Sequence, residues 1–161
     1  MKKKIIAVLV LALLVSTVSV FALGIGIQGG AGFTGDADDQ IPGNVAITFK
    51  VDQSPLVFAT NFYIDSKKFL VGLTGDYWIS NANLAGPVNY FVGVGLGGTI
   101  GISDPLVFNA AARLPIGINA FFAKGVIEPY AQVVPMLNLK VLPTFTTKFA
   151  VDANVGIRFW F

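Results

Sequence analysis

Residues 149–161 of the chain read FAVDANVGIRFWF, and apolar side chains alternate there with small or polar ones. Successive side chains of a β-strand point to opposite faces, so every second residue from Phe149 to Phe161 lies on one apolar face. The opposite face carries Asp152, Asn154 and Arg158. A tilted strand needs about ten residues to cross a membrane. The stretch therefore predicts a transmembrane β-strand that ends on an aromatic residue.

The N-terminus has the features of an export signal. Three lysines at positions 2–4 precede an uncharged apolar run over residues 5–23, which predicts a secretory signal peptide, residues 1–22, cleaved after Ala22. An uncleaved signal anchor is the alternative, because the apolar run is long enough to span a bilayer. The remaining domain, residues 23–161, carries eight Lys/Arg and nine Asp/Glu. It therefore lacks the basic excess of a nucleic-acid-binding protein.

The composition excludes several kinds of chemistry. The chain has no cysteine and no histidine, so disulfides, thiolate sites, histidine ligands and histidine bases are ruled out. Apolar residues make up 54% and charged residues 12%, about half the charged share of a soluble domain. Beyond the N-terminal segment no apolar run reaches helix-spanning length, which favours membrane strands. We expect no enzyme activity, no cofactor and no metal site.

Eight runs of the domain alternate with period two between turn signals. They cover residues 23–33, 45–52, 56–65, 69–79, 88–102, 108–119, 127–138 and 149–161. Pro115, Pro129 and Pro135 predict irregular sixth and seventh strands, because proline cannot donate to a ladder. The sequence therefore predicts an all-β fold, an eight-stranded antiparallel up-and-down transmembrane β-barrel with both termini on the periplasmic side.

Two polar stretches between these runs are expected to be loops. SNANLAGP, residues 80–87, would lie on the periplasmic side, and TGDADDQIPGN, residues 34–44, would be an acidic surface loop. Asp36, Asp38 and Asp39 lack the spaced ligands and terminal glutamate of a calcium loop. A solvated loop is therefore favoured over a cation site.

Outward aromatic residues are expected at both rims of the barrel, where membrane barrels carry aromatic girdles. The outer rim would hold Phe33, Phe62, Phe69, Phe108 and Phe149. The periplasmic rim would hold Phe49, Phe58, Tyr77, Tyr90, Phe159 and Phe161.

Charged residues of the predicted strands fall on the inward faces. The inward charges that are candidates for a site are Lys50, Asp76, Arg113, Glu128, Asp152 and Arg158, together with Lys148 directly before the last strand. Buried or lumenal charges must be paired or hydrated, so we expect ion pairs that hold the barrel shut. Glu128 and Arg158 lie near the same end of adjacent strands, where they are placed to pair. A selectivity ring for a solute pore and a titratable pair for acid–base chemistry are the alternatives.

Glycines line the inward faces of the first and fifth strands. They are Gly24, Gly26, Gly30 and Gly32 on one, and Gly93, Gly95, Gly97 and Gly101 on the other. They either open a narrow lumen or make room for large inward side chains, namely Tyr63, Trp78, Phe91 and Trp160. An eight-stranded interior is just wide enough for side chains to fill, so filling is favoured.

Two stretches carry a resemblance to a known family. Residues 112–139, ARLPIGINAFFAKGVIEPYAQVVPMLNL, and residues 151–161, VDANVGIRFWF, resemble the small eight-stranded outer-membrane barrel proteins of diderm bacteria, spirochaetes among them, with OmpA transmembrane-domain-like or OmpW-like architecture. The resemblance implies export through a signal peptide, location in the bacterial outer membrane, and a C-terminal aromatic signature read by the barrel-assembly machinery, here Phe159 and Phe161. It implies no shared catalytic residues.

The favoured function is a structural or membrane-integrity role for an outer-membrane barrel with a largely plugged lumen. A narrow conduit for small apolar or polar solutes is the first alternative, and a surface-interaction protein is the second. The expected partners are outer-membrane lipid and the assembly machinery during insertion, and we expect a monomer.

Overall fold

The computed structural model of the chain describes residues 22–34, 43–64, 69–102 and 106–161. The strands in these ranges are β1 Leu23–Thr34, β2 Asn44–Val51, β3 Leu56–Ile64, β4 Phe69–Ala85, β5 Val88–Ile102, β6 Val107–Arg113, β7 Ile116–Ala120, β8 Ile127–Leu142 and β9 Thr146–Trp160. A short 3-10 turn, η2 Ala123–Gly125, precedes β8. The predicted all-β fold is confirmed. Residues 1–21 of the predicted signal peptide and residues 35–42 of the acidic loop lie outside the described residues.

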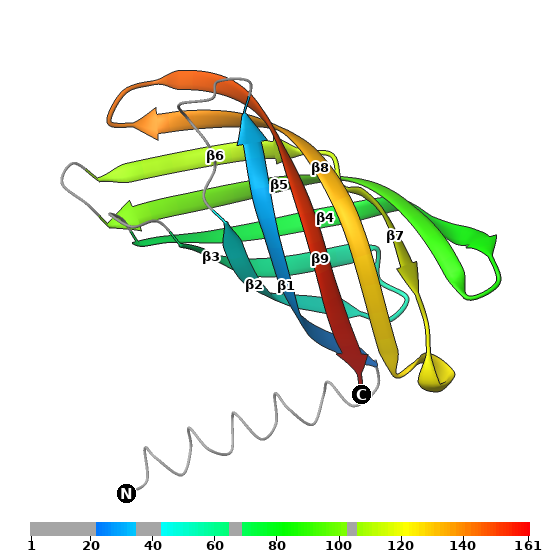
Figure 1. Cartoon of the computed structure of the whole chain (residues 1–161). Helices are drawn as coiled ribbons and strands as arrows, with labels where there is room; N and C mark the ends of the chain where they lie inside the picture. Colours follow the sequence, from blue (N-terminus) through cyan, green and yellow to red (C-terminus); the bar gives the residue numbers. More distant parts are fainter. Residues whose placement is uncertain (1–21, 35–42, 65–68, 103–105) are drawn as a thin grey trace, which may run out of the picture.

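The strands form one antiparallel sheet that closes on itself (Figure 1). Both β6 and β7 pair with β5 on one side and with β8 on the other, so they are two halves of one strand. The nine segments of the described residues therefore act as eight strands, and β1 closes the ring by pairing with β9. The Leu23 amide donates to the Phe161 carbonyl at 3.3 Å. We call the end of the barrel where Leu23 and Phe161 lie the terminal end, and the opposite end the far end.

The register fixes the stagger of the strands. Paired residues can be followed once around the barrel from Thr34 on β1 back to Gly24 on the same strand. The path runs through Ala150, Met136, Arg113, Gly95, Asp76, Val57 and Lys50. It returns ten residues away along β1, which is the shear of the barrel. Barrel strands tilt by roughly 35–45°, and eight of them enclose a space that side chains can fill.

Prolines explain where the sixth strand breaks. Leu114 and Pro115 separate β6 from β7. The Pro115 carbonyl accepts from the Gly93 amide at 2.8 Å, and the Leu114 amide donates to the Pro135 carbonyl at 2.9 Å. Proline serves here as an acceptor only, because it has no amide hydrogen. The irregularity predicted for the sixth strand is therefore confirmed.

The irregularity predicted for the seventh strand is wrong. β8 is continuous from Ile127 to Leu142, and its register with β9 does not shift at Pro129 or Pro135. Pro135 faces the gap between β6 and β7, and Pro129 lies one residue beyond Tyr130, the last residue of β8 that pairs with β7. Both prolines therefore sit where β8 needs no donor on that side.

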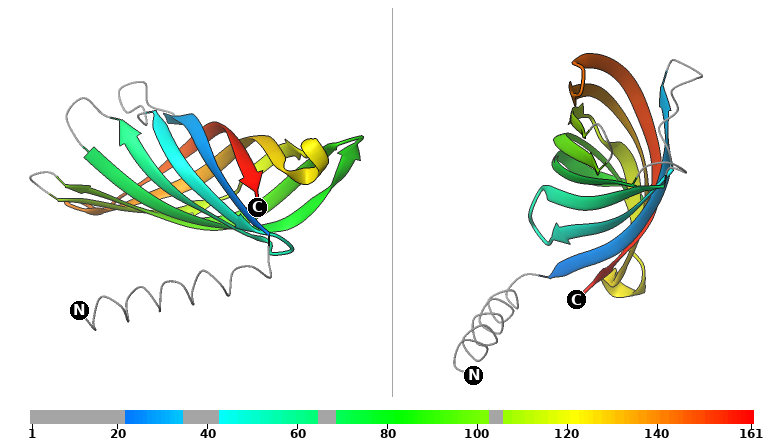
Figure 2. Two further views of the ribbon diagram at one scale, coloured as in Figure 1. Left: turned by 90° about the horizontal axis from the view of Figure 1, so that it is seen from below. Right: turned by 90° about the vertical axis from the view of Figure 1, so that its left-hand side faces the viewer.

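The fourth strand is longer than the sequence predicts. β4 continues through SNANLA to a turn that includes Gly86, so the loop expected at 80–87 is wrong. The register with β5 shifts at two bulges, one after Trp78 and one after Asn83. The Asn83 amide group closes the turn by donating to the carbonyls of Gly86 at 2.9 Å and Val88 at 3.2 Å. The resulting β4–β5 hairpin projects past the neighbouring strands (Figure 2).

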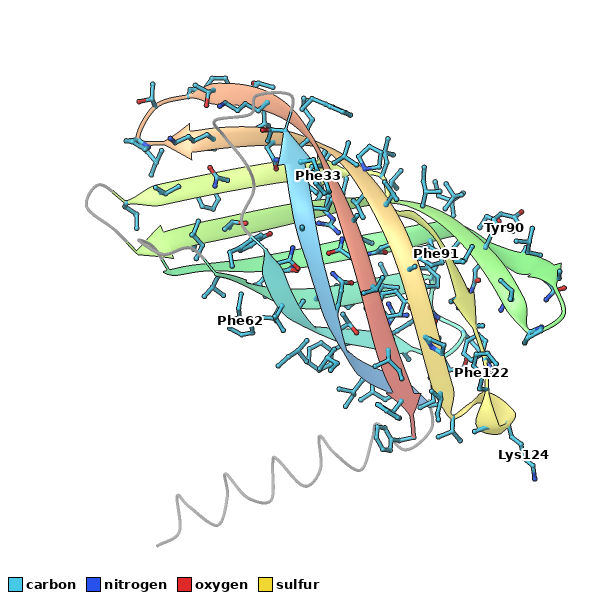
Figure 3. All side chains as sticks on the ribbon, viewed as in Figure 1. Phe33, Phe62, Tyr90, Phe91, Phe122 and Lys124 are labelled. Atoms are coloured by element: carbon cyan, nitrogen blue, oxygen red, sulfur yellow. The ribbon has the colours of Figure 1, made fainter. Side chains whose placement is uncertain are left out.

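Side chains cover both faces of the sheet (Figure 3), and the two faces differ in chemistry. Large apolar residues on the outer face are exposed, including Ile27 at 62%, Leu96 at 71% and Val155 at 65%. Gln28, Asn61 and most described strand charges are buried inside. No helix in the described part of the chain is long and apolar enough to cross a membrane. The barrel is therefore apolar outside and polar inside, the reverse of a soluble barrel.

The aromatic residues predicted at the two rims lie on the apolar outer face of the barrel. At the far end Phe33 and Phe149 are exposed, and Phe62 and Phe108 are half-buried. Six aromatic residues toward the terminal end are exposed: Phe49, Phe58, Tyr77, Tyr90, Phe159 and Phe161. Phe69 begins β4 at the far end.

Candidate functional site

Glu128 is the centre of a buried network near the terminal end. Its register partner across the β8–β9 ladder is Arg158, which is why the two side chains meet. Arg158 Nη1 lies 3.0 Å from Glu128 Oε1, and the exposed fractions are 1% and 0%. Glu128 Oε1 also accepts from Asn119 Nδ2 at 2.8 Å, and Oε2 accepts from Trp160 Nε1 at 2.9 Å. The carboxylate is therefore fully partnered inside the barrel.

Aromatic rings fill the cross-section next to this network. Trp78 and Phe91 stack with centroids 3.9 Å apart and ring planes 8° apart. The Arg158 guanidinium lies 4.0 Å from the centroid of Tyr130. The Lys50 ammonium lies 5.3 Å from the ring centroids of both Trp78 and Trp160. A cation on an aromatic face is stabilised more strongly when it is desolvated. The layer therefore accommodates two buried cations, Lys50 and Arg158, with Glu128 as its one buried carboxylate.

Two glutamines extend the polar contacts from this layer toward the middle of the barrel. Tyr130 donates its hydroxyl to Gln28 Oε1 at 3.0 Å. Gln132 Nε2 donates to the same oxygen at 3.3 Å. Both glutamines and Tyr130 are buried, so these contacts tie β1 to β8 through the interior.

A second ion pair lies nearer the middle of the barrel. Arg113 Nε donates to Asp76 Oδ1 at 3.0 Å, and Arg113 Nη2 donates to Asp76 Oδ2 at 3.4 Å. The exposed fraction of each side chain is 7%. The two residues come from β4 and β6, which do not pair with each other. Both are register partners of Gly95 on β5, the strand between them.

Inward glycines make such contacts possible across an intervening strand. A Cβ on Gly95 would overlap the Asp76 carboxylate, so the ion pair occupies the space that the glycine leaves. Gly24 lies in the same way between Lys50 and Trp160. A Cβ there would lie 2.9 Å from the Trp160 ring. The inward glycines at these positions therefore make room for side chains, as predicted, instead of opening a lumen.

The same arrangement recurs on β9. Gly156 lies between its register partners Tyr130 and Gln28, which form the hydrogen bond described above. A Cβ on Gly156 would overlap the Tyr130 ring. Large and polar side chains from neighbouring strands thus meet across inward glycines on several strands of the barrel.

The structure places the seven predicted site residues unequally. Lys50, Asp76, Arg113, Glu128, Asp152 and Arg158 are buried inside the barrel. Lys148 is exposed near the far end and has interactions of its own. Ion pairs join Asp76 to Arg113 and Glu128 to Arg158, while the Lys50 ammonium lies over aromatic rings.

Sequence reasoning missed the neutral members of the network. Strand parity places Asn119, Gln28 and Gln132 on inward faces, but no motif marks them as partners of Glu128 or Tyr130. The signal that would have found them is the register, which puts Asn119 beside Tyr130 and places Gln28 and Tyr130 on either side of Gly156. The described residues include no group of three or more His, Cys, Asp or Glu placed to hold a metal ion.

No protein-family model and no curated protein sequence matches the chain. Among solved structures, neisserial surface protein A (NspA) is similar with a TM-score of 0.57 over 88% of this chain and 97% of that chain, at 14% identity. The fold is that of a small outer-membrane barrel. The N-terminal β-barrel domain of OprF from Pseudomonas aeruginosa is similar with a TM-score of 0.51 over 86% of this chain and 97% of that domain, also at 14% identity. The predicted resemblance to small outer-membrane barrels is confirmed for the fold.

Proposed function

We propose that this chain is an integral protein of the bacterial outer membrane with a structural role and a sealed interior. The observation that carries the proposal is the contrast between the two faces of the closed sheet. Charges of the described strands lie inside or at strand ends, and the exposed outer face is apolar from Ile25 to Phe159. An outer face of this kind is stable only where lipid covers it, because water-exposed apolar patches of such extent drive association.

The buried layer near the terminal end supports a sealed interior. Trp78, Phe91 and Tyr130 are each at most 4% exposed, and Arg158 and Glu128 are at most 1% exposed. A solute that crossed the barrel would have to displace stacked rings and break the Glu128–Arg158 ion pair. Breaking a buried pair without replacement costs about 3–5 kcal/mol. A structural role therefore fits this interior better than conduction does.

A narrow conduit is the second candidate, because the far end is less tightly filled. Inward side chains there, Tyr63, Thr99, Asn109 and Asn138, are half-buried and not fully buried. Small solutes would enter at this end and meet the Asp76–Arg113 pair first.

The remaining elements of the proposal concern export and assembly. A cleaved signal peptide, residues 1–22, would deliver the chain, and lipid would contact the outer face. Phe161 is 81% exposed and Phe159 is 42% exposed, so both rings are accessible to the assembly machinery that would read them. The barrel would be a monomer, since the closed ring leaves no strand of the described sheet to complete.

Heat-modifiability tests the proposal. The mature chain, residues 23–161, is refolded into detergent and run on a gel with and without boiling. A membrane barrel resists the gel detergent and migrates as a compact band until boiled, so we expect two distinct mobilities. Detergent is then removed, and we expect the chain to precipitate or associate. A mature chain that stays folded, soluble and monomeric without detergent would overturn the proposal.

A further inference from the structure

Three polar residues, Asn44, Asp152 and Asn154, lie on the two strands that flank the inward glycines of β1 in the far half of the barrel. Gly30 on β1 has Asn44 on β2 and Asn154 on β9 as its two register partners. Gly32, the next inward residue of β1, is paired with Asp152 on β9. A Cβ on Gly30 would overlap the Asn154 amide, so this side chain lies across the glycine, toward β2. Strand β1 thus lies between Asn44 on β2 and the two β9 residues, and its inward residues there are glycines. We call Gly30 and Gly32 the glycine floor.

These side chains are buried, and each leaves an oxygen without a hydrogen-bond donor. Asn44, Asp152 and Asn154 are each 4% exposed. The Oδ1 atom of each is buried and has no hydrogen-bond partner among the described residues. At Gly24, Gly95 and Gly156 the flanking side chains complement each other, as cation and ring, ion pair, or donor and acceptor. Over Gly30 the unsatisfied atoms are three oxygens, which lack a positively charged or donating partner.

The charge balance points the same way. Arg113 is the buried cation of this half of the barrel, but its guanidinium is already held by Asp76 through two hydrogen bonds. Asp76 and Asp152 therefore share one buried cation, because Lys148, on the same strand as Asp152, is exposed and has interactions of its own. The unpaired buried cation, Lys50, is far away: its partner on β1 is Gly24, while that of Asp152 is Gly32. Eight residues of strand correspond to roughly 26 Å.

We propose that Asp152, Asn154 and Asn44 bind a hard cation of the size of Ca²⁺ or Na⁺ over the glycine floor of β1. Carboxylate and amide oxygens are the ligands that such cations prefer, and water completes their coordination. Water alone would satisfy the amide oxygens but would leave the Asp152 charge uncompensated in the interior. One carboxylate and two neutral amides make a weak site, in the range of about 0.1–1 mM for Ca²⁺. The cation would fasten β9 to β2 across β1.

The test measures how cations change thermal unfolding of the refolded barrel. The protein is dialysed against a chelator into choline chloride, whose cation is too large for the site, and CaCl₂ or NaCl then replaces choline chloride at constant ionic strength. A ligand that binds only the folded state raises the unfolding midpoint. At ten times the dissociation constant we expect a rise of about 3–6 °C for a chain of this size. The two salts distinguish a divalent from a monovalent occupant.

Matched variants locate the effect. Asp152→Asn keeps the shape and removes the charge, so it should abolish the cation-dependent shift. Asp52→Asn, an identical change at an exposed residue of the terminal end, should leave the shift intact. Should Asp152→Asn fail to refold, Asn154→Ala replaces it as the variant that loses the shift.

Two results would overturn the proposal. One is a wild-type midpoint that is equal in choline, sodium and calcium salts, with calorimetric titration showing no binding heat for Ca²⁺ or Na⁺. The interior would then hold ordered water only. The other is a shift of the same size in Asp152→Asn and wild type, which would place the cation elsewhere.

Discussion

At the scale of single residues, Glu128 is the acceptor on which the sealed layer depends. It receives hydrogen bonds from Asn119, Arg158 and Trp160 while fully buried. Glu128→Ala should lower the free energy of unfolding by about 3–5 kcal/mol, because the Arg158 charge would be left buried and uncompensated. Urea titration of the barrel folded in lipid vesicles measures this free energy by linear extrapolation.

A double variant and a surface variant control this prediction. Glu128→Leu combined with Arg158→Leu removes both charges, and it should cost less than either single change. Lys124→Ala, at the exposed turn before β8, should change the free energy of unfolding by no more than about 0.5 kcal/mol. Single variants at positions 128 and 158 that each cost under about 1 kcal/mol, and that add in the double variant, would show that the two residues are not coupled.

Which residues face inward could be predicted from the sequence, but which of them meet could not. Alternation alone places Asp76, Arg113, Glu128 and Arg158 inside. Glu128 and Arg158 lie on adjacent strands at similar distances from a strand end, so their pairing was also predictable. Asp76 and Arg113 lie on non-adjacent strands. Their side chains meet because both residues are register partners of Gly95, which has no side chain to come between them. That register is a property of the closed barrel and has no local signature.

At the scale of elements, β5 carries glycines with two different roles. A Cβ on Gly93 would lie 2.5 Å from the backbone oxygen of Tyr77 and 3.2 Å from Trp78 Cα. Gly93→Ala should therefore force β4 and β5 apart and lower the free energy of unfolding by about 1–3 kcal/mol. At Gly98 on the same strand the nearest atom to a Cβ is 4.0 Å away. Gly98→Ala should leave stability unchanged or raise it by up to about 1 kcal/mol.

The same urea titration compares the two glycine variants on one strand. Equal losses of stability in Gly93→Ala and Gly98→Ala would indicate that glycine matters for backbone freedom throughout β5. It would contradict the assignment of the Gly93 space to close packing against β4.

The bounds of most strands followed from alternation, and the exceptions have local causes. SNANLAGP contains Asn, Gly and Pro, which are typical of loops, yet it continues β4 because two bulges realign the strand with β5. The bulge after Trp78 interrupts the period-two pattern on which the sequence argument rests. The Asn83 contacts that fix the turn depend on the hairpin already being formed. The irregularity that Pro129 and Pro135 predict is wrong for a related reason. A proline disturbs a ladder only where the strand opposite needs a donor, and that depends on the register.

At the scale of the whole molecule, strand number and shear together explain why the interior is filled. Eight strands with a stagger of ten residues enclose a space just wide enough for side chains to fill. Trp78, Phe91, Tyr130 and Arg158 are enough to close it at one level, and the inward glycines let those large groups fit. The sequence could predict eight strands and a polar interior. To predict at which level of the barrel the aromatic rings meet, the register of the strands would have been needed.

We propose that the layer formed by the Glu128–Arg158 ion pair and the aromatic rings seals the interior of this closed barrel in the membrane. Planar-bilayer recording tests it most directly, with protein whose folding has been verified by heat-modifiability and with boiled protein as the control. Folded wild-type barrels are expected to insert without conductance steps, because stacked rings and a buried ion pair occupy the cross-section. Reproducible steps from the folded protein, absent from the boiled control, would contradict the claim and favour the narrow conduit.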